Sequence, residues 1–191
     1  RGHVTFGSFN ALGKISPVTL DLWSAVLGAV PESRLRLKSS LAADGDAWSR
    51  VVEHLRARGV DPGRLEIRSG CATHKAHLEQ YRHIDIALDT YPYHGTTTTC
   101  EALFMGVPVV TLAGDRHVSR VGVSLLSRVG LSDLIGSSPE EYARIAFGLA
   151  SEPERLSLLR ATLRERLECS PLRDEMGFAR TLEVALQRMW R

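Results

Sequence analysis

The sequence lacks the features that would mark a secreted, membrane-spanning or nucleic-acid-binding protein. Its cysteines are few, odd in number and far apart: Cys71, Cys100 and Cys169. That pattern predicts no disulfide framework and favours a reducing compartment, so we expect a cytoplasmic location. No apolar run approaches the ~18 residues that a membrane-spanning helix needs. The formal net charge of +2 predicts no attraction to nucleic acid or to a membrane surface.

Two common nucleotide-binding motifs are also missing. A Walker A loop that ends in Gly13-Lys14 would need a glycine where the chain has Ser8. No predicted strand is followed by Gly-x-Gly-x-x-Gly, which argues against a dehydrogenase. The chain enters a strand-like run at residues 3–9 almost directly after Arg1, so we expect a fragment of a longer protein.

What the sequence does contain is a regular alternation of strand-like and helix-like segments. Strands are predicted at residues 4–9, 33–38, 65–67, 84–88 and 109–112. Helices are predicted at residues 20–30, 46–58 and 75–81, from the threonine run to 105, and at 119–129, 140–150, 152–168 and 176–189. This order is typical of a Rossmann-like α/β fold, an open parallel sheet with helices on both faces. We assign residues 1–137 to that core and 138–191 to a C-terminal helical segment.

One stretch after a predicted strand, from Asp89 to Glu101, predicts a phosphate site. It follows a nearly all-apolar strand and contains Gly95 and four consecutive threonines, directly before a helix. The first N–H groups of a helix have no partner within it, and they lie at the positive end of its dipole. Parallel sheets bind ligands at the carboxyl ends of their strands, so this helix start is well placed for phosphate.

A capping box is the alternative interpretation of the same stretch. In that arrangement Thr98 would be the N-cap and Glu101 the third helical residue, each bonded to the backbone of the other. Glu101 could instead contact a ribose hydroxyl, as acidic residues near nucleotide sites do.

Lys14 lies in the loop after the first predicted strand. Its ammonium group would point across the crevice toward the threonine run, where it could stabilise a leaving diphosphate. An ordinary surface lysine is the alternative. Arg116 and Arg120, after the strand at 109–112, could also screen phosphate charge. Arg120 could equally be a solvated helix residue.

His74 and His77 lie three residues apart at the start of a predicted short helix. No matching Cys/His pair lies nearby at metal-site spacing, so we predict no metal. A ring stacked on a nucleobase, or a polar contact with its ribose, is the favoured interpretation. An ordinary helix start with exposed histidines is the alternative.

These motifs together resemble the C-terminal catalytic lobe of the O-linked N-acetylglucosaminyltransferase family, especially its SPINDLY-type branch. The resemblance covers essentially the whole chain in order. It is carried by Phe9-Asn10 with Lys14 and Pro17, by residues 85–90, by Pro92-Tyr93, by residues 95–101, 105–111 and 121–124, and by the ending Ser170-Pro171 … Met189-Trp190. The specific part is the threonine run combined with the turn Gly106-Val107-Pro108.

The resemblance implies a GT-B fold of two Rossmann-like lobes, of which this would be the donor-binding C-terminal one. An N-terminal lobe and any helical repeats that recruit substrate would lie upstream of Arg1. The implied reaction is an inverting transfer of a sugar from a nucleotide donor to Ser or Thr hydroxyls of proteins, without metal or other cofactor. The implied donor-binding residues are Ala72, His74, His77, Tyr93, Gly95, Thr96, Thr97, Thr98 and Glu101, with Lys14 as the catalytic residue.

The resemblance also implies a role for most of these residues. Lys14 would contact the diphosphate, and the threonines at 96–98 would hold phosphates at the helix start. Glu101 would contact the ribose. The backbone of Ala72 and the ring of His77 would hold the base.

Four positions differ from the members that transfer N-acetylglucosamine. Those members have glutamine, lysine, arginine and histidine where this chain has Ala11, His74, Gln80 and Thr96, respectively. SPINDLY-type proteins that use GDP-fucose share the four-threonine run. Because UDP-N-acetylglucosamine is the commoner donor assignment in the family, we expect it as the donor here, with GDP-fucose as the alternative. A non-catalytic nucleotide-binding or scaffold module is the alternative from another functional class.

Overall fold

The computed structural model describes residues 2–39 and 45–190, and its centre is a six-stranded sheet. Every strand pairs in parallel with its neighbours, in the order β3-β2-β1-β4-β5-β6. The strands are β1 (Thr5–Ser8), β2 (Arg34–Lys38), β3 (Leu65–Arg68), β4 (Ile86–Leu88), β5 (Val109–Leu112) and β6 (Ile135–Gly136). The predicted parallel α/β sheet is confirmed. β6 was not predicted, because its two residues form no apolar run.

The strand order reverses between β1 and β4, which pair directly in the middle of the sheet. From β1 the chain moves outward to β3, and it then returns to the other side of β1 with β4. The connections that follow β1 and β4 therefore diverge, and they leave a crevice at the carboxyl ends of these strands. Both elements that we singled out in the sequence, the Lys14 loop and the threonine run, begin at this crevice.

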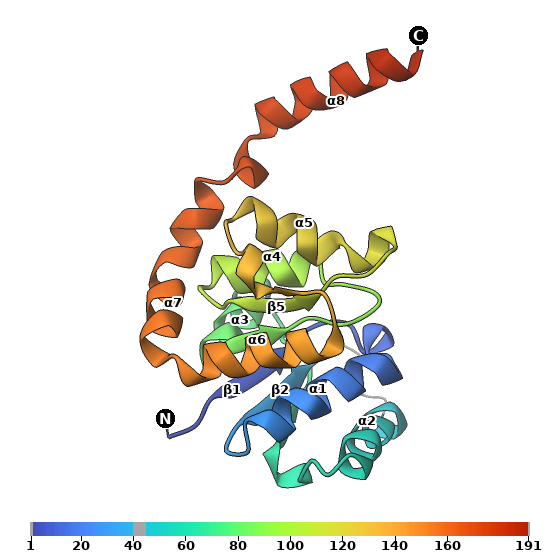
Figure 1. The fold of residues 1–191 in the computed structure, drawn as a ribbon, viewed down its shortest axis with the longest axis vertical. Helices are drawn as coiled ribbons and strands as arrows, with labels where there is room; N and C mark the ends of the chain where they lie inside the picture. The colour runs from blue at the N-terminus through green and yellow to red at the C-terminus, as the bar shows by residue number, and fades with distance from the viewer. Residues whose placement is uncertain (1, 40–44, 191) are drawn as a thin grey trace.

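Helices cover both faces of the sheet (Figure 1). They are α1 (Pro17–Ala29), α2 (Gly45–Ala57), α3 (His74–Glu79), α4 (Thr97–Phe104), α5 (Val121–Arg128), α6 (Pro139–Ser151), α7 (Pro153–Glu168) and α8 (Glu175–Trp190). α1 and α6 pack side by side, and α4 and α5 contact each other and β5. α7 contacts both α4 and α6, so it joins the two groups of helices.

Helix α1 begins three residues before the predicted start. The hydroxyl of Ser16 accepts a hydrogen bond from the backbone N–H of Thr19 at 3.1 Å, and Pro17 occupies the first helical position. A serine cap followed by proline is a favourable helix start, because both residues suit the unpaired N–H groups there. Of the predicted loop at 38–45, residues 40–44 lie outside the described residues.

Two helices hold the residue that follows β4 in place. Trp23 of α1 donates from Nε1 to the carbonyl oxygen of Asp89 at 3.4 Å, and the hydroxyl of Tyr142 in α6 donates to the same oxygen at 3.2 Å. Both aromatic side chains are fully buried. The predicted boundary at residue 137 lies just before α6, which packs on α1 and β5. The division into core and helical segment stays a prediction.

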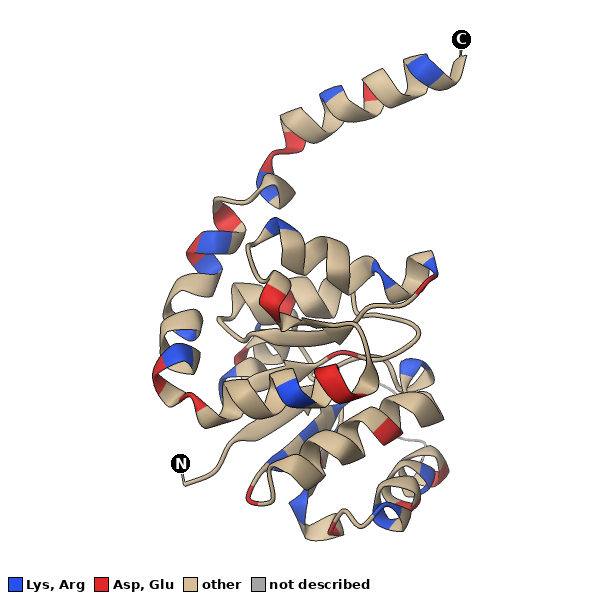
Figure 2. Ribbon diagram, in the orientation of Figure 1, with Lys and Arg blue, Asp and Glu red and all other residues tan. Residues whose placement is uncertain are grey.

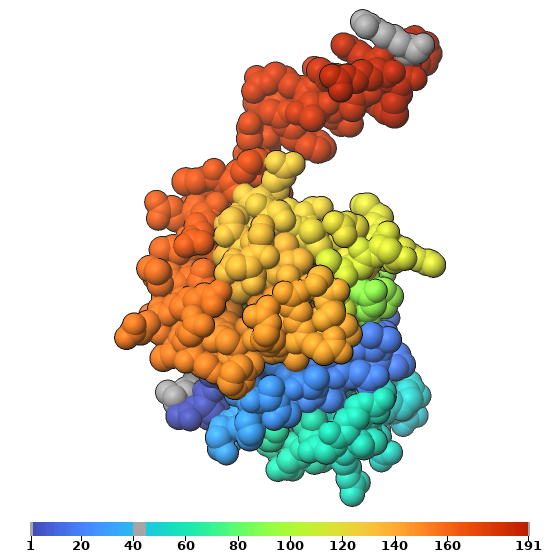
Figure 3. Space-filling model, in the orientation of Figure 1, coloured from blue at the N-terminus to red at the C-terminus, as the bar shows by residue number. Residues whose placement is uncertain are grey.

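α8 differs from the other long helices, because none of its residues is buried. It stands away from the body of the protein (Figure 3), and its Trp190 is 94% exposed. Lysine and arginine alternate with aspartate and glutamate over the surface, in agreement with the small net charge (Figure 2). Within the described ranges, no helix combines the length and the apolar character that crossing a bilayer requires.

Candidate nucleotide-binding site

Lys14 faces the threonine-bearing turn, as predicted. It ends the short 3₁₀ helix η1 (Leu12–Lys14), which follows β1. Its Nζ donates a hydrogen bond to the carbonyl oxygen of His94 at 3.0 Å and lies 4.3 Å from the centroid of the Tyr93 ring. Partial burial lowers the pKa of Lys14, and the negative charge of Asp89 opposes that change. The two sides of the crevice thus meet at this ammonium group.

The turn that carries Gly95 is shaped by a buried carboxylate, Asp89. Its Oδ1 accepts hydrogen bonds from the backbone N–H groups of Thr90 at 2.9 Å and Gly95 at 2.8 Å. Its Oδ2 accepts from the hydroxyl of Thr111 at 2.7 Å. A Cβ atom at Gly95 would lie 2.5 Å from Oγ1 of Thr98, so only glycine fits at this approach.

His94 lies beneath the same turn and is fully buried. One ring nitrogen, Nε2, lies 2.9 Å from the carbonyl oxygen of Leu112, and the other, Nδ1, lies 3.0 Å from the backbone nitrogen of Gly122. A carbonyl only accepts and an N–H only donates, so Nε2 carries the hydrogen and the ring is neutral. Burial lowers the pKa of His94, although the charge of Asp89 opposes that change.

The four threonines divide into two pairs. Thr96 and Thr97 are exposed. Thr98 donates from Oγ1 to Oδ1 of Asn10 at 2.8 Å, and the buried Thr99 donates to the carbonyl oxygen of Gly95 at 3.1 Å. The first pair is therefore open to a ligand, whereas the second pair fixes the start of α4 against β1 and the turn.

The capping box considered for Thr98 and Glu101 is wrong. The helix begins at Thr97, with Thr96 at the N-cap position, and no cap side chain bonds to the first turn. Thr98 is held by Asn10, and Glu101 bonds to residues outside the helix. Since no side chain caps this helix end, its first N–H groups are available to an anion.

A hollow of about 400 Å³ lies beside the start of α3. The predicted base-binding residues Ala72, His74 and His77 all line it. Thr73 caps α3 by accepting from the N–H of Ala76 at 3.1 Å, so an ordinary helix cap is also present. The structure brings these residues together, and their contact with a base stays a prediction.

Glu101 joins the base end of the site to the threonine run. Oε1 accepts from Nε2 of His74 at 3.1 Å, and Oε2 lies 2.9 Å from Nε2 of His77 and 3.3 Å from the Tyr81 hydroxyl. Burial raises the pKa of Tyr81 well above its usual range, so the phenol stays protonated. Glu101 does not act as a cap, and its contact with a ribose stays a prediction.

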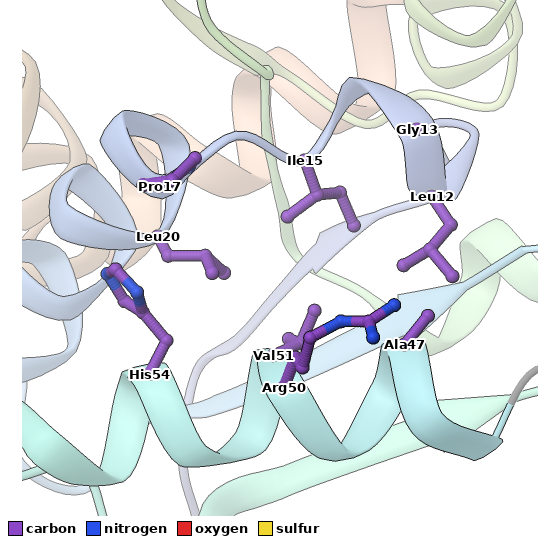
Figure 4. A pocket seen from close by; sticks show the side chains of 9 residues that line it. All are labelled: Leu12, Gly13, Ile15, Pro17, Leu20, Ala47, Arg50, Val51 and His54. Atoms are coloured by element: carbon purple, nitrogen blue, oxygen red, sulfur yellow. The ribbon is translucent and has the colours of Figure 1, made fainter.

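Two further hollows lie near the site. The larger, of about 600 Å³, lies between the η1 loop and α2, where Leu12 points toward Ala47 and Ile15 toward Val51 (Figure 4). None of the predicted site residues lines it. The smaller, of about 310 Å³, is lined by Thr96 together with Arg120 and His117. Arg120 is exposed and donates to the carbonyl oxygen of Gly114 at 3.0 Å, so a role beside the phosphates stays a prediction.

The contacts among His74, His77 and Glu101 do not form a metal-binding arrangement. Across residues 2–39 and 45–190, no group of three or more His, Cys, Asp or Glu side chains is arranged to hold a metal ion. The charged side chains at this site include Lys14, Lys38 and Glu101.

Comparison with known proteins places the chain in a family. The family model described as glycosyl transferase family 41 matches residues 2–182. The chain belongs to glycosyltransferase family 41. The resemblance inferred from the motifs is confirmed.

The relatives in this family are much longer than the chain. A probable UDP-N-acetylglucosamine–peptide N-acetylglucosaminyltransferase SPINDLY from Solanum lycopersicum is 45% identical over 191 residues, which are 100% of this chain and 20% of that protein. The chain thus spans about one fifth of the length of these curated relatives.

Solved structures agree with the fold assignment. A mutant of the Thermobaculum terrenum O-GlcNAc transferase superposes with a TM-score of 0.91 and 44% identity, over 100% of this chain and 36% of that one. The C-terminal domain of a group 1 glycosyltransferase from Francisella tularensis has a TM-score of 0.62 at 14% identity, over 86% of this chain and 84% of that one. The second likeness concerns the fold alone. Family 41 chains and their structural neighbours share this GT-B lobe.

Reasoning from the sequence missed several residues that build the site. Asp89 and His94 belonged to the selected stretch but received no role. Asn10 was named only as part of the family resemblance, and Tyr81 only as the end of a predicted helix. Their contacts join segments up to 88 positions apart, so local pattern could not reveal them. Lys38 was missed too, although a charged residue at the end of a buried strand is a signal that could have been used.

Proposed function

We propose that this chain is the donor-binding lobe of a protein O-glycosyltransferase that transfers N-acetylglucosamine from UDP-N-acetylglucosamine to Ser or Thr hydroxyls. The observation that carries the proposal is the position of Lys14. Its ammonium group lies on the His94 carbonyl, beside an uncapped helix start, at the crevice where the strand order reverses. These are the groups that a nucleoside diphosphate requires.

The same groups account for the chemistry. The oxygen of the acceptor hydroxyl attacks the anomeric carbon from the face opposite the diphosphate, and the bond to the diphosphate oxygen breaks. The hydroxyl proton is released to solvent, and the configuration inverts. The leaving diphosphate gains charge in this step. The ammonium group of Lys14 and the first N–H groups of α4 would stabilise that charge, because both are held in place before the reaction. This account needs no metal ion.

The choice of donor and acceptor rests on the relatives. The Solanum lycopersicum and Caenorhabditis elegans proteins are both named as UDP-N-acetylglucosamine–peptide N-acetylglucosaminyltransferases, the latter at 32% identity over 98% of this chain. Since the chain covers 20% of the first and 16% of the second, residues outside it would bind the protein acceptor.

Replacement of Lys14 by alanine in the full-length protein tests the mechanism. We expect kcat to fall about 100-fold or more, the usual effect of losing one preorganised charge-stabilising group. Lys75→Ala, an exposed lysine on α3, is the control and should keep the wild-type rate. Unchanged activity of Lys14→Ala would contradict the proposed role. A full-length protein without activity, but with nucleotide binding, would favour the scaffold alternative.

A calorimetric titration separates the candidate donors. UDP and GDP are titrated separately into the 191-residue chain. Tighter binding of UDP would support UDP-N-acetylglucosamine as the donor, and tighter binding of GDP would support GDP-fucose. If neither nucleotide binds, the assignment of the crevice as a nucleotide site is wrong.

A further inference from the structure

Lys38 is a buried lysine that the proposed mechanism does not use. The chain has three lysines, Lys14, Lys38 and Lys75, and its other side-chain cations at neutral pH are arginines. Lys75 is exposed on α3. Lys14 follows β1, whereas Lys38 is the last residue of the neighbouring strand β2, so both lie at the carboxyl edge of the sheet. Lys38 is only 5% exposed, which is unusual for a residue whose charge is strongly hydrated.

The contacts of Lys38 fix the orientation of His77. Its Nζ forms a hydrogen bond with Nδ1 of His77 and lies 5.2 Å from the centroid of the Phe9 ring. An ammonium group only donates, so Nδ1 accepts and the ring hydrogen is on Nε2. Nε2 can then donate to Glu101, 2.9 Å away. Lys38 and Glu101 thus hold the imidazole from both sides.

The ammonium group of Lys38 retains capacity for a ligand. It has three N–H donors, and its contacts within the described residues use one of them for a hydrogen bond, to His77. Lys38 lines the hollow of about 400 Å³ that Ala72 and His77 also line. Burial lowers the pKa of Lys38, although the neighbouring Cys71 and Glu101 oppose that change. A buried donor of this kind is satisfied only by an acceptor, which a bound molecule would supply.

We propose that Lys38 reads the exocyclic carbonyl of the donor's base and so selects uracil or guanine over cytosine and adenine. This inference rests on the proposed function, because it assigns the base to the hollow beside α3. O4 of uracil and O6 of guanine are acceptors that an ammonium N–H can bond. Cytosine and adenine carry an amino group at the corresponding position, so two sets of donors would face each other. A site built around a hydrogen bond rejects the analogue that cannot form it.

Two matched pairs of nucleotides test this role on the unmodified chain. UDP and CDP differ at the 4-position of the pyrimidine, and GDP and ADP differ most at the 6-position of the purine. Each is titrated calorimetrically into the 191-residue chain. We expect the carbonyl-bearing member of the tighter-binding pair to bind at least about tenfold more tightly than its amino counterpart, the effect of one charge-assisted hydrogen bond.

The variant Lys38→Met then assigns that preference to one side chain. Methionine keeps the apolar stem and removes the donors. We expect the preference to fall below about twofold and binding of the carbonyl-bearing nucleotide to weaken about tenfold. Lys75→Met is the matched control and should keep the wild-type preference. A circular-dichroism melt of each variant verifies that the chain remains folded.

The outcomes distinguish this role from the proposed function. If UDP and CDP bind equally tightly to the wild type, and GDP and ADP do too, the role of Lys38 is wrong and the nucleotide site stands. A preference that survives in Lys38→Met also overturns the role. If no nucleotide binds to the wild type, the proposed function itself fails.

Discussion

Two carboxylate–histidine pairs lie at opposite ends of the threonine-bearing stretch, and their surroundings differ sharply. In the first pair, Oδ2 of Asp89 lies 3.7 Å from Nδ1 of His94, and the two side chains are 1% and 0% exposed. In the second pair, Oε2 of Glu101 lies 2.9 Å from Nε2 of His77, and the side chains are 13% and 20% exposed. The same residue types thus occur once inside the fold and once at the border of a hollow.

The difference between the pairs lies in their partners. Asp89 accepts from two backbone N–H groups and one hydroxyl, and both nitrogens of His94 are bonded to backbone groups. Both side chains are buried and bonded within the fold, so this pair maintains the shape of the turn. Glu101 accepts from side chains that a ligand could displace. We infer that the inner pair, Asp89 and His94, keeps the turn in shape. The outer pair, Glu101 and His77, is available to a nucleotide.

The largest predicted effect is a difference in the folding stability that is lost when the carboxylate of each pair is removed. Asp89→Ala should lower the free energy of unfolding by about 3 kcal/mol, because two buried N–H groups and a buried hydroxyl lose their acceptor. Glu101→Ala should cost less than about 1 kcal/mol, since the Tyr81 hydroxyl can turn to the carbonyl oxygen of Thr98, 3.2 Å away. Urea unfolding measures both. Equal losses would show that Glu101 is as structural as Asp89.

The second prediction concerns the pH dependence of the inner pair. Burial lowers the pKa of His94 in the folded chain below the unfolded value of about 6.5. The unfolded chain therefore binds this proton more readily, so stability is present above pH 6.5 and is lost as the pH falls toward the folded pKa. As the pH falls from 7 to 5.5, this group should lower the free energy of unfolding.

Replacement of His94 by glutamine should make that decline shallower, as urea unfolding at several pH values would measure. The raised pKa of buried Asp89 acts in the opposite direction, because its folded form takes up a proton more readily. Leu126→Ala is the control for destabilisation alone, because Leu126 is fully buried and its side chain does not ionise. An unchanged slope in His94→Gln would mean that His94 is already protonated in the folded protein.

The inner and outer pairs also show what sequence could and could not predict. The alternation of apolar strands and amphipathic helices predicted the parallel sheet, and the strand–turn–helix pattern around the threonine run predicted the place of the site. The serine–proline start of α1 was present in the sequence but was not used. The separate roles of Asp89 and Glu101 follow from Thr111, His74 and His77, which reach them from other elements. Such contacts depend on how the helices pack, which local pattern does not encode.

The smallest predicted effect applies the same comparison within the threonine run. Thr98→Ala should lower the free energy of unfolding by about 1 kcal/mol, because Oδ1 of Asn10 loses the donor that lies 2.8 Å away. Thr97→Ala should change it by less than about 0.5 kcal/mol, since the exposed hydroxyl makes no hydrogen bond within the described residues. UDP binding should respond in the opposite order and weaken more in Thr97→Ala, because Thr97 is an exposed residue at the uncapped helix start. If Thr98→Ala is the weaker binder at equal stability, the division of the threonines into a structural and a ligand-facing pair is wrong.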